Sequence, residues 1–304
     1  MIINNVKNIF RSKHNRILLL MIAIAIISCL FFMFYGLGEV SQKTYNYAIS
    51  IRKPRLVAMI LAGSCIGYAS IAFQSVIRNT IVTPCLLGMN SLYSLIQTTI
   101  FFLLGANSIF VYNTNVSFLL NLSIMSFVAV FMYGYLFRKT KYNVLYVLLA
   151  GTVLSSLFGS LTTGMTRVMD PNTYDTLLDN LVASFGRVNA DILWLSAIIM
   201  FAILMVFRKE FALLDVITLG KEQAINLGVD YDKTISRILL AVVVLIAIAT
   251  ALVGPISFLG LIIANISRQL FKTFKHSYLL IGSVLAGIII LAGGQACIEH
   301  LLPF

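Results

Sequence analysis

Few residues in this sequence could carry out acid–base, nucleophilic or metal chemistry, and they lie far apart. The three histidines, His14, His276 and His300, are scattered along the chain. Glu299 and His300 are adjacent, but no residue of ligand type follows them at the third or fourth position, as metal sites on helices require. The four cysteines form no C-x-x-C pair, so we expect them to be small buried side chains. The sequence predicts no catalytic residue, no metal site and no cofactor.

ATP hydrolysis is not encoded either. A phosphate-binding loop has the pattern G-x-x-x-x-G-K-[ST], whereas the Gly220-Lys221 pair has Asp215 in place of the first glycine and Glu222 in place of the hydroxyl residue. Residues 291–295 are LAGGQ, which imitates a signature of ABC ATPases, but they end an apolar segment in a chain without a phosphate loop. We interpret that match as a coincidence, because a motif needs its structural context.

The elements that must position any functional residue are apolar. Of the 304 residues 60% are hydrophobic and 11% are charged, and the mean hydropathy is +0.96. Continuous apolar segments of about 20 residues are typical of transmembrane helices and not of alternating barrel strands. We therefore expect an all-α, polytopic transmembrane bundle in which residues 1–304 form a single domain. Spans are expected at about 17–36, 55–77, 86–104, 116–137, 143–165, 190–207, 235–253 and 277–297, with a short apolar piece at 256–266 and ordered loops at 36–54 and 166–189.

The net charge of +11 is explained by where the basic residues fall. Most of the 22 Lys and Arg residues belong to the N-terminus and to alternate connections between spans, such as those around Arg78 and Arg138. Cytoplasmic connections of membrane proteins carry such an excess. The pattern predicts a cytoplasmic N-terminus, and it indicates membrane lipid and no nucleic acid as a partner.

The eleven acidic residues nearly all lie in loops or at the ends of spans. A transporter driven by an ion gradient usually keeps an ionisable group within the membrane. Away from their ends the predicted spans lack an acidic residue, which disfavours a gradient-driven secondary transporter without removing it as an alternative. A membrane scaffold without transport activity is a second alternative.

One polar stretch, Thr218–Lys233, stands out from the apolar background. Together with the residues just before it, this stretch predicts two short helices, Leu213–Leu219 and Lys221–Leu227. Each is ended by a glycine, Gly220 and Gly228. Helices this short do not hold together alone in water, so they must lean on another surface. That surface is either the lipid headgroup region or a cytoplasmic protein.

Several stretches together resemble the FecCD-type permeases, which import ferric siderophores, haem and vitamin B12. These stretches are Arg52–Arg55, Leu61–Asn90, Leu148–Gly151, Leu214–Asp230 with Arg237, and Gly254–Arg268. The resemblance implies the membrane subunit of a type II ABC importer with ten helices. Its implied partners are a second permease subunit, identical or paralogous, a pair of cytoplasmic ABC ATPases and an extracytoplasmic substrate-binding protein. The implied cargo is an iron–siderophore complex, with haem and cobalamin left open, and the implied location is the bacterial cell membrane.

The resemblance also implies three groups of site residues. Arg52 and Arg55 would receive the binding protein, unless they only reach to the membrane interface. Asn79 and Ile81 would narrow the inner end of the path, or only end a helix, and Gln74 would line the path or hydrogen-bond between helices. The residues implied to contact the ATPase are Leu219, Gly220, Glu222, Gln223, Ala224, Leu227 and Gly228.

The chain departs from the family pattern in several places. Residues 78–82 lack the family's proline, and Ala264-Asn265 replaces a Pro-His pair. Val144-Leu145 replaces small polar residues, so no gate is assigned there, and no arginine occurs near Cys297. Phe304 falls where the resemblance places the start of the family's last helix, so we expect that helix to be missing from this sequence.

Overall fold

The computed structural model describes residues 13–37, 41–106, 108–140, 144–186, 188 and 190–301. Over these residues the fold is all-α, as predicted, and six helices are long and apolar enough to cross a membrane. They are α2 (Lys13–Phe34), α3 (Gln42–Ile77), α6 (Thr114–Lys139), α7 (Val144–Thr166), α13 (Tyr231–Val253) and α15 (His276–Leu301).

The other elements are shorter. Three are apolar helices of 13 to 17 residues: α4 (Met89–Leu104), α9 (Ala190–Val206) and α14 (Leu259–Phe271). The segment expected as a span at 190–207 is α9, with bounds that match the prediction to within one residue. The segment expected at 86–104 is α4, which starts three residues later because the 3₁₀ turn η1 (Pro84–Leu87) and Gly88 precede it. The remaining short elements are α5 (Ile109–Tyr112), α8 (Pro171–Leu181), α10 (Arg208–Ala212), α11 (Leu214–Ile217) and α12 (Lys221–Asn226).

One expected loop is largely helical. Most of the segment 36–54 forms the first turns of α3, which continues through Pro54 and has 36 residues, a length of about 54 Å. The prediction of a loop there was wrong because the polar residues of Gln42–Arg52 hide a helix from a hydropathy pattern. The loop at 166–189 does contain the expected local order: Asp170 caps α8 by accepting hydrogen bonds from the backbone N–H groups of Asn172 and Thr173.

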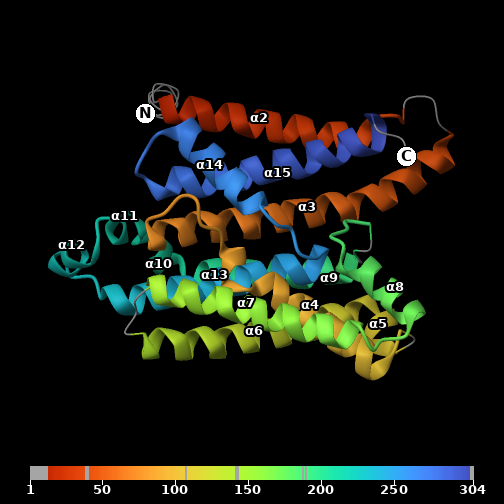
Figure 1. Cartoon of the computed structure of the whole chain (residues 1–304). Coiled ribbons are helices and arrows are strands. Elements are labelled where there is room, and N and C mark those ends of the chain that lie inside the picture. Colours follow the sequence, from red (N-terminus) through yellow and green to blue (C-terminus); the bar gives the residue numbers. More distant parts are fainter. Residues whose placement is uncertain are drawn as a thin grey trace.

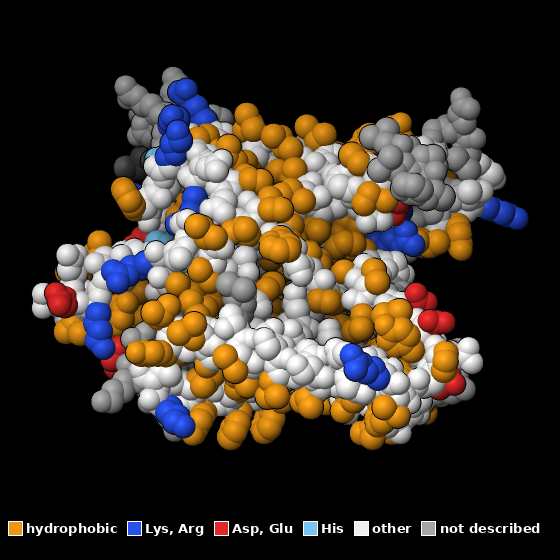
Figure 2. Space-filling model, viewed as in Figure 1, with side chains coloured by type: hydrophobic (Ala, Val, Ile, Leu, Met, Phe, Trp, Pro, Cys, Tyr) orange, Lys and Arg blue, Asp and Glu red, His pale blue; other side chains and the backbone are white. Residues whose placement is uncertain are grey.

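Helix α3 is the centre of the bundle. It packs against α15 on one side and against α13 on the other, while α2 covers α15 and the pair α4 and α7 lies beyond α13 (Figure 1). The short helices α10–α12 project from the end of the bundle where α2 begins, and α5 and α8 lie at the opposite end (Figure 1). Hydrophobic side chains cover the middle of the visible face, and charged side chains gather toward its two ends (Figure 2). This distribution is the one expected of a bundle that crosses a membrane.

Small residues allow α3 and α15 to approach closely. A Cβ atom on Gly67 would lie 3.0 Å from the backbone carbon of Ser283, and one on Gly63 would lie 3.1 Å from that of Gly287. Without a hydrophobic driving force between helices in lipid, such close backbone contact is a main source of helix association. We call the contact of Gly63 and Gly67 with Ser283 and Gly287 the α3–α15 seam.

The α3–α15 seam predicts that the same Gly→Ala substitution has opposite effects on stability inside and outside the seam. Gly67→Ala forces a methyl group against backbone atoms that cannot rotate away, so it should destabilise the protein by about 1–3 kcal/mol. Gly134→Ala in α6 is the matched control, because a Cβ there meets nothing within 4 Å and should gain about 0.5–1 kcal/mol of helix propensity. Thermal unfolding in detergent measures both variants. An unfolding temperature for Gly67→Ala equal to or above that of the wild type would contradict the seam.

Candidate functional site

The predicted short helices project from one end of the bundle between α9 and α13. The sequence placed them at 213–219 and 221–227; the structure has α11 and α12 there, preceded by the additional turn α10. The predicted glycines do occur at the breaks, with φ of +107° at Gly220 and +82° at Gly228. Side chains at those two angles would be strained, so the glycines define where each short helix ends. We call residues 208–228 the coupling segment.

The coupling segment is held on its inner side by burial. Leu214 and Ile217 of α11 and Ala224 of α12 are fully buried, and α11 packs against α3. Three side chains point away instead and are more than half exposed: Leu219, Ile225 and Leu227. Glu222 and Gln223 are exposed between them. The segment therefore presents an outward surface of apolar and polar residues on a backbone that is anchored from behind.

Two ion pairs tie the coupling segment to α13. Lys221 Nζ lies 2.8 Å from both carboxylate oxygens of Asp232, and Arg237 Nη1 lies 2.9 Å from Glu210 Oε1. Both pairs are partly exposed, so each contributes at most about 1 kcal/mol, but together they fix the orientation of the segment. A movement of α12 is thus coupled to the first turns of α13.

The candidate inner gate lies at the end of α3, at the same end of the bundle. Helix α3 ends in a left-handed residue, Arg78, and the loop from Arg78 to Val82 follows; we call it the gate loop. Within it Asn79 Oδ1 accepts a hydrogen bond of 2.9 Å from the backbone N–H of Ile81, whose side chain is 76% exposed. An exposed isoleucine on a hydrogen-bonded turn can obstruct a path without disturbing the core.

Gln74 is buried beneath the gate loop. Its Nε2 donates a hydrogen bond of 2.8 Å to the carbonyl oxygen of Thr80, and its Oε1 accepts one of 3.2 Å from Arg268 Nε. Of the two alternatives for this residue, the structure shows the hydrogen bond between helices. Gln74 positions the gate loop from below, and a direct role in lining the path stays a prediction.

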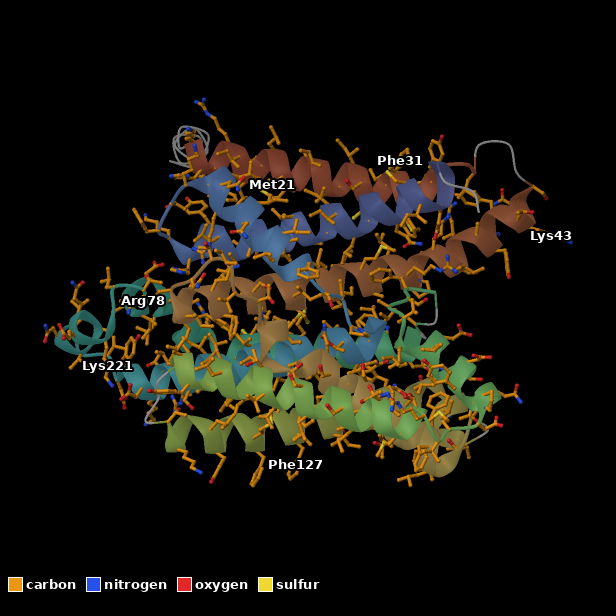
Figure 3. The ribbon with its side chains drawn as sticks, in the orientation of Figure 1. Met21, Phe31, Lys43, Arg78, Phe127 and Lys221 are labelled. Carbon is orange, nitrogen blue, oxygen red and sulfur yellow. The ribbon has the colours of Figure 1, made fainter. Side chains whose placement is uncertain are left out.

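The gate loop and the coupling segment touch. A Cβ atom on Gly220 would lie 3.0 Å from Nη1 of Arg78, so the guanidinium group covers the glycine backbone. Arg78 and Lys221 lie at the same end of the molecule, opposite Lys43 (Figure 3). Residues that are about 140 positions apart in the sequence are thereby in contact.

The two candidate docking arginines belong to the opposite end of α3. Arg52 Nη1 donates hydrogen bonds to the carbonyl oxygens of Met33, in the last turn of α2, and of Tyr35, just after it. Arg55 Nη1 lies 3.2 Å from Glu299 Oε1, with side chains 32% and 22% exposed. Both arginines therefore have partners within the chain and still present charge at the surface.

Two groups of residues were missed from the sequence. His276 and Asp215, 61 positions apart, form a polar cluster with Ser75 and Arg268, and no local spacing in the sequence indicates it. The other group is a polar stripe that runs along the largely exposed helix α7 and ends at Arg167, just after the helix; it lines an open groove. Its members are Ser156, Gly159, Ser160, Thr163, Gly164 and Arg167. Recurring hydroxyl and glycine residues at helical spacing on an exposed face were the available signal. Among the residues that the structure describes, no group of three or more His, Cys, Asp and Glu side chains could hold a metal ion.

The fold matches that of a solved transporter. A solved protein described as a metal-chelate type ABC transporter in an inward-facing conformation matches with a TM-score of 0.82 and 20% identity, over 94% of this chain and 91% of that chain. The fold is thus that of an ABC transporter permease, a bundle of apolar helices with short helices at one end.

Sequence relatives identify the family. Residues 16–304 match the FecCD transport family. The chain is 40% identical over 286 residues to the petrobactin import system permease protein YclO of Bacillus subtilis (strain 168), covering 94% of this chain and 89% of that protein. It is 32% identical over 302 residues to the petrobactin import system permease protein FatC of Bacillus anthracis, covering 96% and 84%. It is 27% identical over 283 residues to the vitamin B12 import system permease protein BtuC of Vibrio vulnificus (strain CMCP6), covering 90% and 82%.

The chain belongs to the FecCD transport family, which confirms the resemblance drawn from its motifs. It is a membrane permease subunit of an ABC importer and not itself an enzyme, as predicted. Permeases of this class work with an ATPase and a substrate-binding protein and often form pairs.

Proposed function

We propose that this chain carries an iron–siderophore complex across the bacterial cell membrane, with petrobactin as the first candidate cargo. The observation that carries the proposal is the 40% identity to a petrobactin permease over 94% of the chain, followed by 32% to a second one. The vitamin B12 permease is less similar, at 27%. A chelator brings its iron already wrapped in ligands, so such a cargo requires no metal ligands from the permease.

The orientation we propose places the coupling segment in the cytoplasm. The start of α2, the end of α3 and the coupling segment lie at one end of the bundle (Figures 1 and 3), and this end carries Lys13, Arg78, Lys221 and Lys233. An excess of basic residues is typical of the cytoplasmic side. The N-terminus would therefore be cytoplasmic, and Arg52 and Arg55 would lie at the outer rim.

In this orientation we propose a transport role for each set of candidate site residues. The exposed face of the coupling segment would seat on the ATPase through Leu219, Glu222, Gln223 and Leu227, with Gly220, Ala224 and Gly228 setting its shape. Asn79 and Ile81 would close the inner end of the path, positioned by Gln74. ATP binding and hydrolysis in the partner would shift the permease between states through a coupling free energy, with no covalent chemistry in this chain.

A second permease subunit is supported by α7. Only a small part of this helix is buried within the chain, although the polar stripe from Ser156 to Arg167 runs along it. Hydroxyl groups and an arginine are unfavourable against lipid tails and are expected to face protein or a water-filled path. We therefore propose that α7 faces the second subunit across the translocation path. Co-purification of the complex would identify that subunit as a second copy of this chain or as a paralogue.

Transport assays in proteoliposomes test the cargo. The permease complex with its ATPase and binding protein should take up ⁵⁵Fe-labelled ferric petrobactin when ATP is enclosed. Labelled ferric hydroxamate, ferric enterobactin and vitamin B12 are assayed in parallel. We expect petrobactin uptake to exceed that of the other three. Uptake that needs an ion gradient but no ATP would instead support a secondary transporter, and preference for vitamin B12 would overturn the proposed cargo.

Leu227 offers a test of the coupling surface. Leu227→Asp places a charge on a side chain that is 62% exposed, so the fold should be retained while an apolar contact with the ATPase is lost. We expect binding of the ATPase to weaken about tenfold or more, as for a central residue of an interface. Val168→Asp is the matched control, because Val168 is 78% exposed and follows α7 at the other end of the bundle. Equal ATPase co-purification by the two variants would contradict the assignment.

A charge exchange separates docking from structure at Arg55. Arg55→Glu combined with Glu299→Arg keeps an ion pair within the chain and reverses the sign at each position. If Arg55 steers an acidic binding protein, association should slow, with the largest effect at low salt. The unfolding temperature should stay close to that of the wild type, because the exchange keeps a partly exposed ion pair at the same place. Unchanged association kinetics would leave Arg55 with only the structural role.

A further inference from the structure

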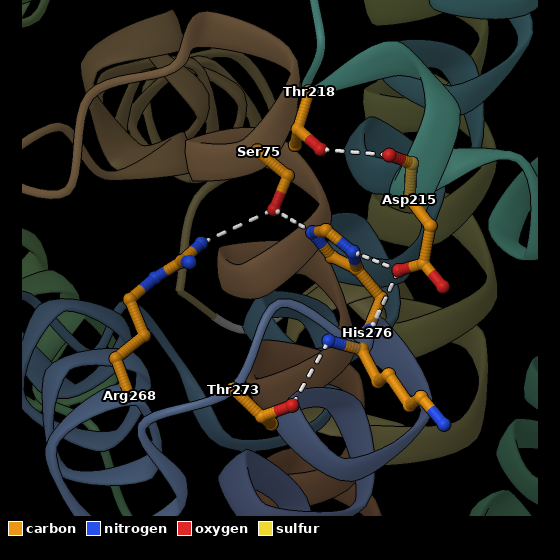
Figure 4. Close-up of polar contacts among 7 residues, drawn as sticks. Ser75, Asp215, Thr218, Arg268, Thr273 and His276 are labelled. Carbon is orange, nitrogen blue, oxygen red and sulfur yellow. Dashed lines mark hydrogen bonds and ion pairs between the residues drawn. The ribbon is translucent and has the colours of Figure 1, made fainter.

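We propose that Ser75, Asp215, Arg268 and His276 form a hydrogen-bonded relay that transmits the position of the coupling segment to the gate loop. This inference rests on the proposed function, since it assigns a mechanical role to residues between two of its parts. The four residues come from α3, α11, α14 and α15, and the relay is where these helices meet (Figure 4).

The contacts within the relay form an unbroken series (Figure 4). Asp215 Oδ1 lies 2.5 Å from His276 Nδ1 and also accepts a hydrogen bond of 2.8 Å from the backbone N–H of His276. His276 Nε2 lies 2.8 Å from Ser75 Oγ, and Arg268 Nη2 donates to that oxygen at 3.1 Å. Ser75 and His276 are buried, while the Asp215 side chain is about half exposed at the coupling segment.

Donor and acceptor roles can be assigned consistently along the whole relay. A carboxylate only accepts, so His276 Nδ1 donates to Asp215, and in a neutral ring Nε2 then accepts from the Ser75 hydroxyl. The Ser75 oxygen in turn accepts from Arg268, a residue that only donates. Hydrogen bonds aligned in series polarise one another, so loss of one member weakens the others.

The relay continues directly into the gate loop. Arg268 Nε donates to Gln74 Oε1, and Gln74 Nε2 holds the carbonyl oxygen of Thr80. A displacement of α11 at Asp215 must therefore either carry α15, α3 and α14 with it or break a hydrogen bond that involves buried Ser75 or His276. Breaking one leaves a buried polar group unpaired, which is costly.

Backbone strain marks the same elements. Among the described residues, the non-glycine residues with positive φ are Arg78, Phe258 and Lys272. Arg78 caps the end of α3 three residues after Ser75, and the other two lie at the two ends of α14, which carries Arg268. Strained conformations of this kind persist where the surroundings over-determine them and are concentrated at switch regions.

The test compares two identical substitutions on one helix. Ser75→Ala removes the central hydroxyl of the relay. Ser70→Ala removes an equally buried hydroxyl from α3 that has no hydrogen-bond partner in the described part of the chain. Wild-type and variant complexes are reconstituted with the ATPase and binding protein, and ATP hydrolysis and uptake of ⁵⁵Fe-labelled ferric petrobactin are measured together.

For Ser75→Ala we expect normal assembly and near-normal hydrolysis, with uptake per ATP reduced about fivefold or more, the size of a typical coupling between sites. Ser70→Ala should match the wild type. A Ser75→Ala complex with the wild-type ratio of uptake to hydrolysis would overturn the relay while leaving the proposed function intact. A wild-type complex without ATP-dependent uptake would instead overturn the proposed function.

A second variant decides the matter if Ser75→Ala does not assemble. Asp215→Asn changes the half-exposed end of the relay, where no core packing is lost. A role in the relay predicts lower uptake per ATP, whereas a purely structural or docking role predicts that hydrolysis and uptake fall together. Where both single variants assemble, the double variant should be no worse than the more severe single one, because both changes break one series. Additive losses would contradict the relay.

Discussion

The close approach of α3 to α15 is the constraint on which the rest of the structure depends. Gly63 against Gly287 and Gly67 against Ser283 fix both the distance between the two helices and their register. That register brings Arg55 to Glu299 at one end of the pair and Ser75 to His276 at the other. An apolar contact in the middle thus determines two polar contacts at the two surfaces, where the partners of an importer would bind.

The coupling segment shows how very short helices can hold a defined shape. Helices of four to six residues have no stability of their own in water. Here burial of Leu214, Ile217 and Ala224 supplies the inner contact, and Lys221 with Asp232 fixes the orientation. The exposed apolar side chains of the outer face, Leu219, Ile225 and Leu227, are not needed for this inner packing. They are therefore available for contact with a partner.

The sequence was sufficient wherever the structure follows local rules. Apolar length predicted the long helices, and glycine positions predicted the breaks at Gly220 and Gly228, because both depend on residues close together in the chain. The helical start of α3 was hidden, since Gln42–Arg52 is polar and a hydropathy pattern does not detect polar helices. The cluster of Asp215 with His276 was missed for a different reason, because it is created by the packing of α11, α3 and α15. The sequence around either residue does not indicate such a contact.

The polar cluster of Ser75, Asp215, Arg268 and His276 is better explained by a mechanical role than by stability. Replacing buried polar groups by apolar side chains of similar volume is often neutral or stabilising, so stability alone does not require Ser75 and His276 at a helix junction. What a directed series of hydrogen bonds provides, and apolar packing does not, is a preference for one relative position of the helices that it joins. The junction lies between the surface that we propose for the ATPase and the loop that we propose closes the path. A preference for one position there is equivalent to a preference for one state of the gate.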